Sequence, residues 1–352
     1  MQLKYYKELD GVRGVAAIMV MLFHYINGLT YSGAFFQFVK KVSFLGQTGV
    51  SLFFVLSGFL ITRILIQQKS QPFYFKNFYF RRALRIFPLY FLFLIIYFII
   101  ISIFNHSFSL NSFFYYVVYI QNFAMTFHWN ITGPEHLWSL AVEEHFYLCW
   151  PLIVYFVDRK YLYHFIIGMI ILSIFIRIYL IHQNLESFYF TFSRLDELSF
   201  GCLLALKELR NELSLKKFKF NKTTITIICF FCISILLIWY LLSGAGNNIV
   251  QIFKYTFLGY IYYIFIGLII QLDMHHCVKK LFTSFPLTFS GKISYGLYIY
   301  HPLCFLLLNY VMDNHFLFLH FLFSVIFTYL ISFISFYYFE NPFIKLKKKL
   351  AI

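Results

Sequence analysis

An arginine and a histidine lie on one face of the first apolar segment of the chain. The segment LDGVRGVAAIMVMLFHY carries Arg13 and His24 eleven positions apart. On an α-helix this spacing brings the two side chains within about 20° of each other, separated by about 16.5 Å along the axis. The histidine is an acid–base group that titrates near neutral pH. The alternative is a structural pair, in which Asp10 neutralises Arg13 and His24 bonds a neighbouring helix.

Two adjacent carboxylates lie inside another apolar run, GPEHLWSLAVEEHFYLCWPL. Glu143 and Glu144 are consecutive, so on a helix they point to different sides and at most one faces a shared pocket squarely. An acidic side chain near the start of a helix interacts favourably with the helix dipole. That structural role would account for Glu135 better than for Glu143 or Glu144. The run has no HExxH spacing, so we predict no metal site.

A basic cluster follows the second apolar run, in KNFYFRRALRIFPLY. Arg82 and Arg85 are three positions apart and would share one face of a short helix. Two guanidinium groups can bind phosphate oxygens in a bidentate way that lysine cannot match. The alternative is the general excess of basic residues in cytoplasmic loops. Together with Arg13, these side chains suit a long phosphate-bearing ligand that enters from the cytoplasm.

Three further ionisable side chains lie in or beside apolar runs, where such groups are costly and suggest function. Arg194 and Asp196 open the run FSRLDELSFGCLLAL, and His301 precedes Pro302 in ISYGLYIYHPL. Because a proline inside a helix frees a backbone carbonyl, His301 could equally bond that carbonyl or serve the reaction.

The elements that must position these residues are membrane-spanning helices. Hydrophobic residues make up 61% and charged residues 12% of the 352, against roughly 45–50% and 25% in soluble domains. Each crossing needs about 20 apolar residues, so about ten spans and short loops use up the chain. We therefore predict an all-α polytopic protein without a separate soluble domain. The apolar runs lie near 12–28, 46–66, 86–104, 137–157, 163–182, 195–209, 225–242, 255–272, 288–310 and 318–339, with an interfacial or re-entrant segment at 113–127.

The distribution of basic residues predicts the orientation. The net charge is +15, and most lysines and arginines fall on segments that alternate along the ten runs. Since cytoplasmic loops carry the excess of Lys and Arg, both termini are expected in the cytoplasm. The charge therefore reflects membrane topology, and nucleic acid is not an expected partner. We expect a transmembrane domain over 5–342 and a basic cytoplasmic tail over 343–352.

Six motifs, in this order along the chain, resemble the acyltransferase-3 family of membrane acyltransferases. The resemblance extends from Leu9 to Pro342. It rests on the Arg-x10-His pattern of Arg13 and His24, on GQTGVSLFFVLSGFLIT (46–62) with Ser57, on RRALRIFPLY, on LWSLAVEEHFYLCWPL with His145 in place of the usual Gln, on SRLDELSFG, and on ISYGLYIYHPL followed by FENP.

The resemblance implies a bacterial plasma-membrane enzyme that moves an acyl group, commonly acetyl from acetyl-CoA, to an extracytoplasmic sugar hydroxyl. Lipopolysaccharide O-antigen, capsule, exopolysaccharide and peptidoglycan are the usual acceptors in the family. It makes His24 the general base, with Glu143 or Glu144 expected to orient it. Arg13, Arg82 and Arg85 would bind the acyl-CoA, and the supporting residues would be Asp10, Ser57, Arg194, Asp196 and His301. No tightly bound cofactor is expected. The expected partners are acyl-CoA, a surface glycan or lipid-linked sugar, and membrane lipid, and a homo-oligomer is compatible with the sequence.

Two other classes of protein compete with this hypothesis. A multi-pass exporter or flippase of glycan or lipid intermediates would favour broken helices and internal repeats, and it would not need an Arg and His pair on one face. A membrane sensor or scaffold would not need buried ionisable residues at all. Transfer of an acyl mark separates the enzyme from the exporter, and binding of acetyl-CoA separates it from the scaffold.

Overall fold

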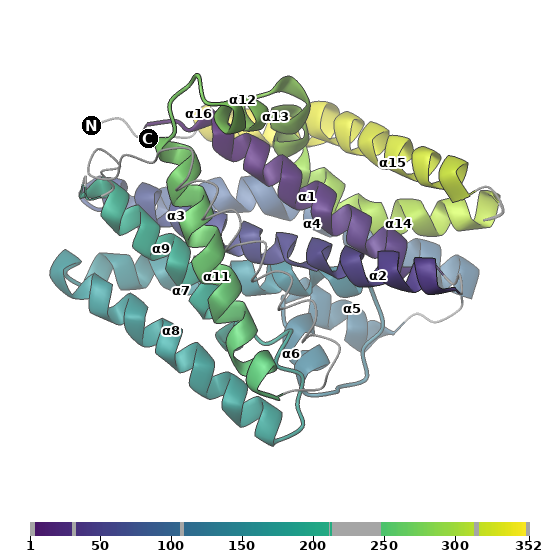
Figure 1. The fold of residues 1–352 in the computed structure, drawn as a ribbon, viewed down its shortest axis with the longest axis horizontal. Helices are drawn as coiled ribbons and strands as arrows, with labels where there is room; N and C mark the ends of the chain where they lie inside the picture. Colours follow the sequence, from purple (N-terminus) through teal and green to yellow (C-terminus); the bar gives the residue numbers. More distant parts are fainter. Residues whose placement is uncertain are drawn as a thin grey trace.

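The structure is a computed structural model, and it describes residues 4–29, 33–105, 109–210, 212, 248–312 and 317–349. All regular elements in these ranges are helical and form a bundle (Figure 1). In chain order they are α1 (Lys7–Asn27), α2 (Ala34–Gln47), α3 (Gly49–Gln68), α4 (Tyr74–Asn105), α5 (Leu110–Val117), α6 (Gln121–Thr126), η1 (Glu135–Leu137), α7 (Trp138–Phe156), α8 (Arg159–His182), η2 (Thr191–Ser193), α9 (Leu195–Leu209), α11 (Asn248–Gln271), α12 (Cys277–Phe282), α13 (Phe285–Lys292), α14 (Ser294–Val311), α15 (Leu317–Ile334), the π-helical η4 (Ser335–Glu340) and α16 (Asn341–Lys349).

Within the described residues, six stretches are long and apolar enough to cross a membrane. They are Lys7–Asn27, Ala34–Gln68, Tyr74–Ile103, Arg159–His182, Asn248–Gln271 and Leu317–Leu346. The predicted all-α fold is therefore confirmed, and the six candidate spans agree with a multi-pass membrane protein. The count of about ten spans stays a prediction, and the run predicted at 225–242 lies outside the described residues.

Several of the predicted runs have different bounds in the structure. The run expected from 86 is longer, because α4 begins at Tyr74 and carries Arg82 and Arg85, which were expected on a separate short helix. The second run was expected to begin near 46, but α2 precedes it and is separated from α3 only by Thr48, whose backbone is itself helical. Lys40 and Lys41 interrupt the apolar pattern of α2, which is why the sequence did not reveal this helix. The run at 288–310 is divided at Ile293 into α13 and α14. The segment at 113–127 forms α5 and α6, both too short to cross a bilayer.

Glycines allow α1 to pack directly on the backbone of α12 and α13. A Cβ added at Gly11 would lie 1.9 Å from the carbonyl oxygen of Phe282, and one at Gly291 would lie 1.7 Å from that of Asp10. Small residues at such crossings let membrane helices approach closely. Gly58 of α3 makes the same kind of approach to Leu198 of α9. These contacts fix the start of α1, which carries Arg13.

Side-chain hydrogen bonds join the start of α1 to the C-terminal parts of α3 and α9. Arg63 on α3 donates two hydrogen bonds to the carboxylate of Glu208 on α9, at 2.9 and 3.0 Å. Tyr6, just before α1, donates to the same carboxylate at 2.8 Å. Burial, and then this hydrogen bond, raise the pKa of Tyr6. Tyr6 therefore stays protonated and keeps α1 tied to α3 and α9.

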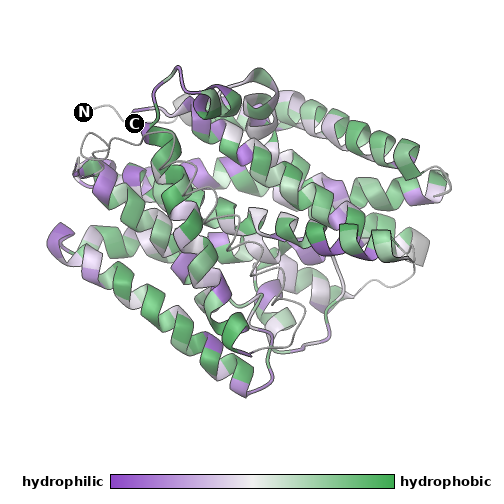
Figure 2. Cartoon of the chain, viewed as in Figure 1, coloured by the Kyte–Doolittle hydropathy of each residue, from purple (hydrophilic) through white to green (hydrophobic). Residues whose placement is uncertain are grey.

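The outer surface of the bundle is apolar, as a surface in contact with lipid must be. Figure 2 shows hydrophobic residues along much of α8 and α15, with hydrophilic residues at the ends of α8. Ile103 on α4, Phe175 on α8 and Phe318 on α15 are among the most exposed large side chains. Monomeric soluble proteins rarely expose so large an apolar area, so this exterior fits a membrane protein.

Candidate active site

A cavity between α1, α3, α4, α7 and α14 brings together residues that are far apart in the sequence. The volume that the centre of a water molecule can occupy there is ≈ 100 Å³. Tyr295 of α14 donates to the carbonyl of Ile86 on α4 at 2.8 Å and so holds one wall. The cavity is lined by Arg13, Val50, Phe53, Phe54, Ser57, Arg82, Arg85, Ile86, Ser139, Leu140, Glu143, Tyr147, Ser294, Tyr295 and Tyr298.

One part of this lining is rich in arginine. Arg13, Arg82 and Arg85, the three arginines predicted to bind acyl-CoA, reach the cavity from α1 and α4. Asp10 lies 3.9 Å from the guanidinium of Arg13, and the guanidinium of Arg82 lies 4.6 Å from the centre of the Tyr147 ring. None of the three arginines is buried. Three accessible guanidinium groups beside one cavity suit an anionic ligand with several oxygens.

A hydrogen-bonded carboxylate lies beside the arginines. Glu143 on α7 accepts from the hydroxyl of Ser57 on α3 at 2.6 Å and from that of Tyr147 at 3.0 Å. The Tyr147 hydroxyl is also 3.1 Å from Ser57 Oγ. Of the two adjacent glutamates, Glu143 lines the cavity and Glu144 does not. Ser57, expected only as a supporting residue, therefore helps to hold a carboxylate in the site.

Three histidines come together beyond the cavity. His24 Nδ1 on α1 lies 2.9 Å from His301 Nε2 on α14. The ring of His136, from η1, is centred 6.4 Å from the ring of His24 and 5.4 Å from that of His301. The partner of His24 is thus a histidine, and the prediction that Glu143 or Glu144 orients it is wrong for this structure. Glu143 is instead bonded to Ser57 and Tyr147.

One layer of hydrogen bonds connects the cavity with the histidines. Tyr298 on α14 donates to the carbonyl of His136 at 2.6 Å and also bonds Ser139, and both Tyr298 and Ser139 line the cavity. His136 donates its Nε2 hydrogen to the carbonyl of Ile299 at 3.2 Å. The arrangement can therefore bind an anionic ligand beside the arginines. The histidines on the other side of this layer can accept or donate a proton.

Sequence reasoning missed four residues of this arrangement: His136, Ser139, Tyr147 and Tyr298. A signal for two of them was present, since Ser139, Glu143 and Tyr147 follow one another at four-residue intervals and must share a helix face. His136 and Tyr298 had no such signal, because their role depends on contacts between distant helices.

Comparison with known proteins identifies the family of this chain. The acyltransferase domain family matches residues 6–337. The chain belongs to this acyltransferase family. The membership in the acyltransferase-3 family that the motifs predicted is thereby confirmed. No solved structure matches it.

Two relatives of this acyltransferase are bacterial proteins. Peptidoglycan O-acetyltransferase OatA of Listeria monocytogenes is 32% identical over 85% of this chain and 49% of its own length. O-acetyltransferase OatA of Staphylococcus aureus is 28% identical over 96% of this chain and 57% of its own length. The chain thus spans about half the length of the curated relatives it matches.

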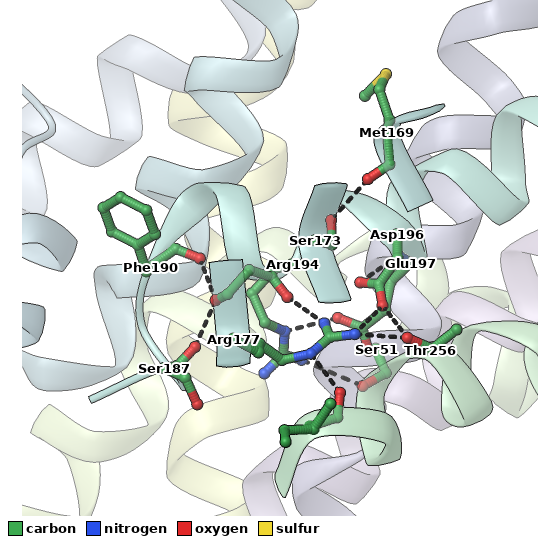
Figure 3. A network of polar contacts seen from close by, with 12 residues as sticks. Ser51, Met169, Ser173, Arg177, Ser187, Phe190, Arg194, Asp196, Glu197 and Thr256 are labelled. Atoms are coloured by element: carbon green, nitrogen blue, oxygen red, sulfur yellow. Dashed lines mark hydrogen bonds and ion pairs between the residues drawn. The ribbon is translucent and has the colours of Figure 1, made fainter. Parts of the chain in front are cut away.

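Arg194 and Asp196 lie in a buried ion-pair network of the acyltransferase, outside the lining of the cavity (Figure 3). Asp196 on α9 pairs with Arg177 on α8 at 2.8 Å, and the hydroxyl of Thr256 on α11 bonds both of them. Arg194 pairs with Glu197 at 2.7 Å. All four charged side chains are buried, so the two sequence candidates connect helices inside the bundle.

The guanidinium of Arg194 connects this network with the cavity wall. It lies 3.7 Å from the centre of the Tyr255 ring, 5.3 Å from that of Trp138 and 5.5 Å from that of Phe54. Phe54 lines the cavity, and Trp138 directly precedes Ser139. Arg194 therefore helps to place α3 and α7 around the site. In the part of the chain that the structure describes, no group of three His, Cys, Asp or Glu side chains converges to hold a metal ion.

Proposed function

We propose that this protein is a bacterial plasma-membrane O-acetyltransferase that moves an acetyl group from cytoplasmic acetyl-CoA to a hydroxyl of an extracytoplasmic cell-surface glycan. The observation that carries the proposal is a cavity lined by three arginines that is connected, through the hydrogen bonds of Tyr298 to Ser139 and His136, with the neighbouring pair of His24 and His301. The names of the two relatives describe them as O-acetyltransferases. The proposed topology has about ten spans over 5–342, with both termini and the 343–352 tail in the cytoplasm.

The arginine end would bind the donor. Arg13, Arg82 and Arg85 would hold the phosphates or the pantetheine arm of acetyl-CoA by charge-assisted hydrogen bonds. Glu143 would keep Tyr147 and Ser57 oriented beside them, because it already accepts from both hydroxyls. Held in this way, the donor would extend its thioester toward Ser139 and Tyr298.

The histidine end would act on the acceptor. His24 would take the proton of the sugar hydroxyl, whose oxygen attacks the thioester carbonyl. The C–S bond then breaks, and the CoA thiolate leaves and receives the proton from His24. The products are an acetyl ester on the glycan and free CoA, with His24 returned to its neutral form. Because the name of one relative includes peptidoglycan, a peptidoglycan fragment is the first acceptor to test, followed by lipopolysaccharide, capsule and exopolysaccharide.

The test is acetyl transfer by the purified protein in lipid vesicles, with labelled acetyl-CoA and a glycan acceptor. We expect label on the glycan, and we expect His24→Gln to reduce transfer by about 10²–10⁴-fold, the usual loss for a general base. Binding of acetyl-CoA to His24→Gln should be unchanged, while Arg13→Ala should weaken it. His182→Gln, an exposed position at the end of α8, is the matched control.

Two results would overturn the proposal. A protein that neither binds acetyl-CoA nor labels any glycan would be the exporter or the scaffold considered above. Near-normal transfer by His24→Gln would remove the assigned base. Mass spectrometry of the surface glycan from cells with and without the gene would identify the acceptor hydroxyl.

A further inference from the structure

The hydrogen bonds of His301 determine which of its ring nitrogens carries the hydrogen. His301 Nδ1 lies 2.9 Å from the carbonyl oxygen of Leu297. A carbonyl only accepts, so the Nδ1 atom must be the donor. In a neutral imidazole the other nitrogen then has a free lone pair. Nε2 of His301 is therefore an acceptor, and it is the atom that faces His24.

The same logic extends to His24. Its Nδ1 lies 2.9 Å from His301 Nε2, and two acceptors cannot bond each other. Nδ1 of His24 must then carry the hydrogen, so Nε2 has the free lone pair. Removing a proton from a hydroxyl requires such a lone pair. His301 is completely buried, whereas His24 is partly exposed, so the nitrogen available to a substrate belongs to His24.

We propose that His301 is a positioning residue that holds His24 in the tautomer with its lone pair on Nε2 and stabilises the imidazolium that forms there during acetyl transfer. The inference rests on the proposed function, in which His24 is the base. When Nε2 of His24 takes the proton, the bond from its Nδ1 to His301 becomes charge-assisted and stronger. In serine hydrolases a carboxylate does this for the histidine. Here a neutral imidazole on a neighbouring helix would do it.

The surroundings of His301 keep its ring in one orientation. The titratable groups that face it are His24 on α1, His136 from η1 and Tyr298 on its own helix, with ring centres 4.9, 5.4 and 6.0 Å away. The ring of Phe305 packs at 5.7 Å. His301 also approaches the carbonyl of Tyr298, which Pro302 leaves without a helical donor. The carbonyl-bonding role considered from the sequence and the functional role are thus combined in one side chain.

The experiment compares two substitutions in the vesicle-embedded protein. His301→Phe keeps a ring of similar shape but removes the acceptor, while His301→Gln offers an amide oxygen to His24. We expect His301→Phe to lower kcat by about 10–100-fold, the loss typical when a partner that orients a metal-binding histidine is removed. The KM for acetyl-CoA should not change, because the arginines are untouched. His301→Gln should recover most of the lost kcat.

The matched control is His320→Phe. His320 is buried on α15 and its Nδ1 lies 2.9 Å from the hydroxyl of Tyr25, which directly follows His24. A general packing defect beside α1 would lower kcat in both phenylalanine variants alike. A specific role for His301 predicts that only His301→Phe does so.

A second measurement does not depend on the folding of any phenylalanine variant. NMR of protein containing ¹⁵N-labelled histidine reports which ring nitrogens carry hydrogen, and loss of one signal set in His24→Gln assigns His24. We expect a protonated Nδ1 and an unprotonated Nε2. The opposite tautomer, or unchanged kcat in His301→Phe of an otherwise active protein, would overturn the inference alone. Absence of transfer by the unsubstituted protein would instead overturn the proposed function.

Discussion

At the scale of single residues, the arginine end of the cavity holds more positive than negative charge. Arg13, Arg82 and Arg85 line it together with the one carboxylate of Glu143. Topology alone would explain basic residues in this segment, but it would not direct them into one cavity. An anionic ligand would complete the balance of charge, and that ligand is the proposed donor.

We expect Arg82→Ala combined with Arg85→Ala to weaken acetyl-CoA binding by at least about tenfold. Hydrogen bonds to charged groups contribute about 1.5–3 kcal/mol each, and about 1.4 kcal/mol corresponds to a factor of ten in affinity. Calorimetry with acetyl-CoA measures the change. Lys76→Ala with Arg81→Ala is the control, because it removes the same charge from the same segment but from outside the cavity lining. Equal affinity for acetyl-CoA in both double variants would mean that Arg82 and Arg85 serve only to set the membrane topology.

The two adjacent glutamates should respond differently to substitution. Glu143→Gln replaces a carboxylate that accepts from Ser57 and Tyr147, and we expect transfer to fall by about tenfold or more, since charge-assisted hydrogen bonds are roughly twice as strong as neutral ones. Glu144→Gln should have a smaller effect, because Glu144 does not line the cavity. Initial rates of transfer from labelled acetyl-CoA are the measurement. A larger loss in Glu144→Gln would mean that the wrong carboxylate has been assigned.

At the scale of helices, the buried network around Arg177 connects α8, α9 and α11, which lie outside the cavity lining. Arg177 donates to the carbonyls of Ile252 and Ser193 as well as to Asp196 and Thr256. A lysine has no planar group that can reach four acceptors at once. Leaving any of these buried groups unpaired is costly.

We expect Arg177→Lys to lower the unfolding temperature of the detergent-solubilised protein by several degrees. A lysine keeps the charge but cannot reach every acceptor, and each buried acceptor left unpaired typically costs about 1–3 kcal/mol. Arg159→Lys at the exposed start of α8 makes the same chemical change and should have no effect. An unchanged unfolding temperature in Arg177→Lys would show that the network does not stabilise the bundle.

The sequence could predict the helices better than the contacts between them. Long apolar runs such as those of α4 and α8 are unambiguous, because a membrane span has a required length. Helix α2 was missed because Lys40 and Lys41 lie in the middle of it. The alignment of Arg13 and His24 follows from helix geometry alone, but the bond from His24 to His301 joins residues 277 positions apart. Such a pairing depends on how helices pack, which one sequence does not reveal.

At the scale of the whole molecule, α1 begins and α16 ends at the same end of the bundle (Figure 1). That arrangement agrees with an even number of crossings. A reporter fused after Ile352 should therefore signal a cytoplasmic location, and a fusion in the segment between α1 and α2 should signal the outside. Because both ends of the chain lie at one end of the bundle, an external signal at Ile352 would place both termini outside and would reverse the proposed direction of transfer.

The contact of α1 with α12 and α13 limits how this chain can vary. Alanine is the smallest change that any glycine can undergo, yet at Gly11 and Gly291 its methyl group would overlap backbone oxygens less than 2 Å away. Gly168 on α8 has no atom within 4 Å of the same position. In a library of all single substitutions selected for glycan acetylation, we expect Gly11 and Gly291 to tolerate no replacement and Gly168 to tolerate many. A crossing of helices outside the cavity lining would then resist substitution as strongly as the residues of the site itself.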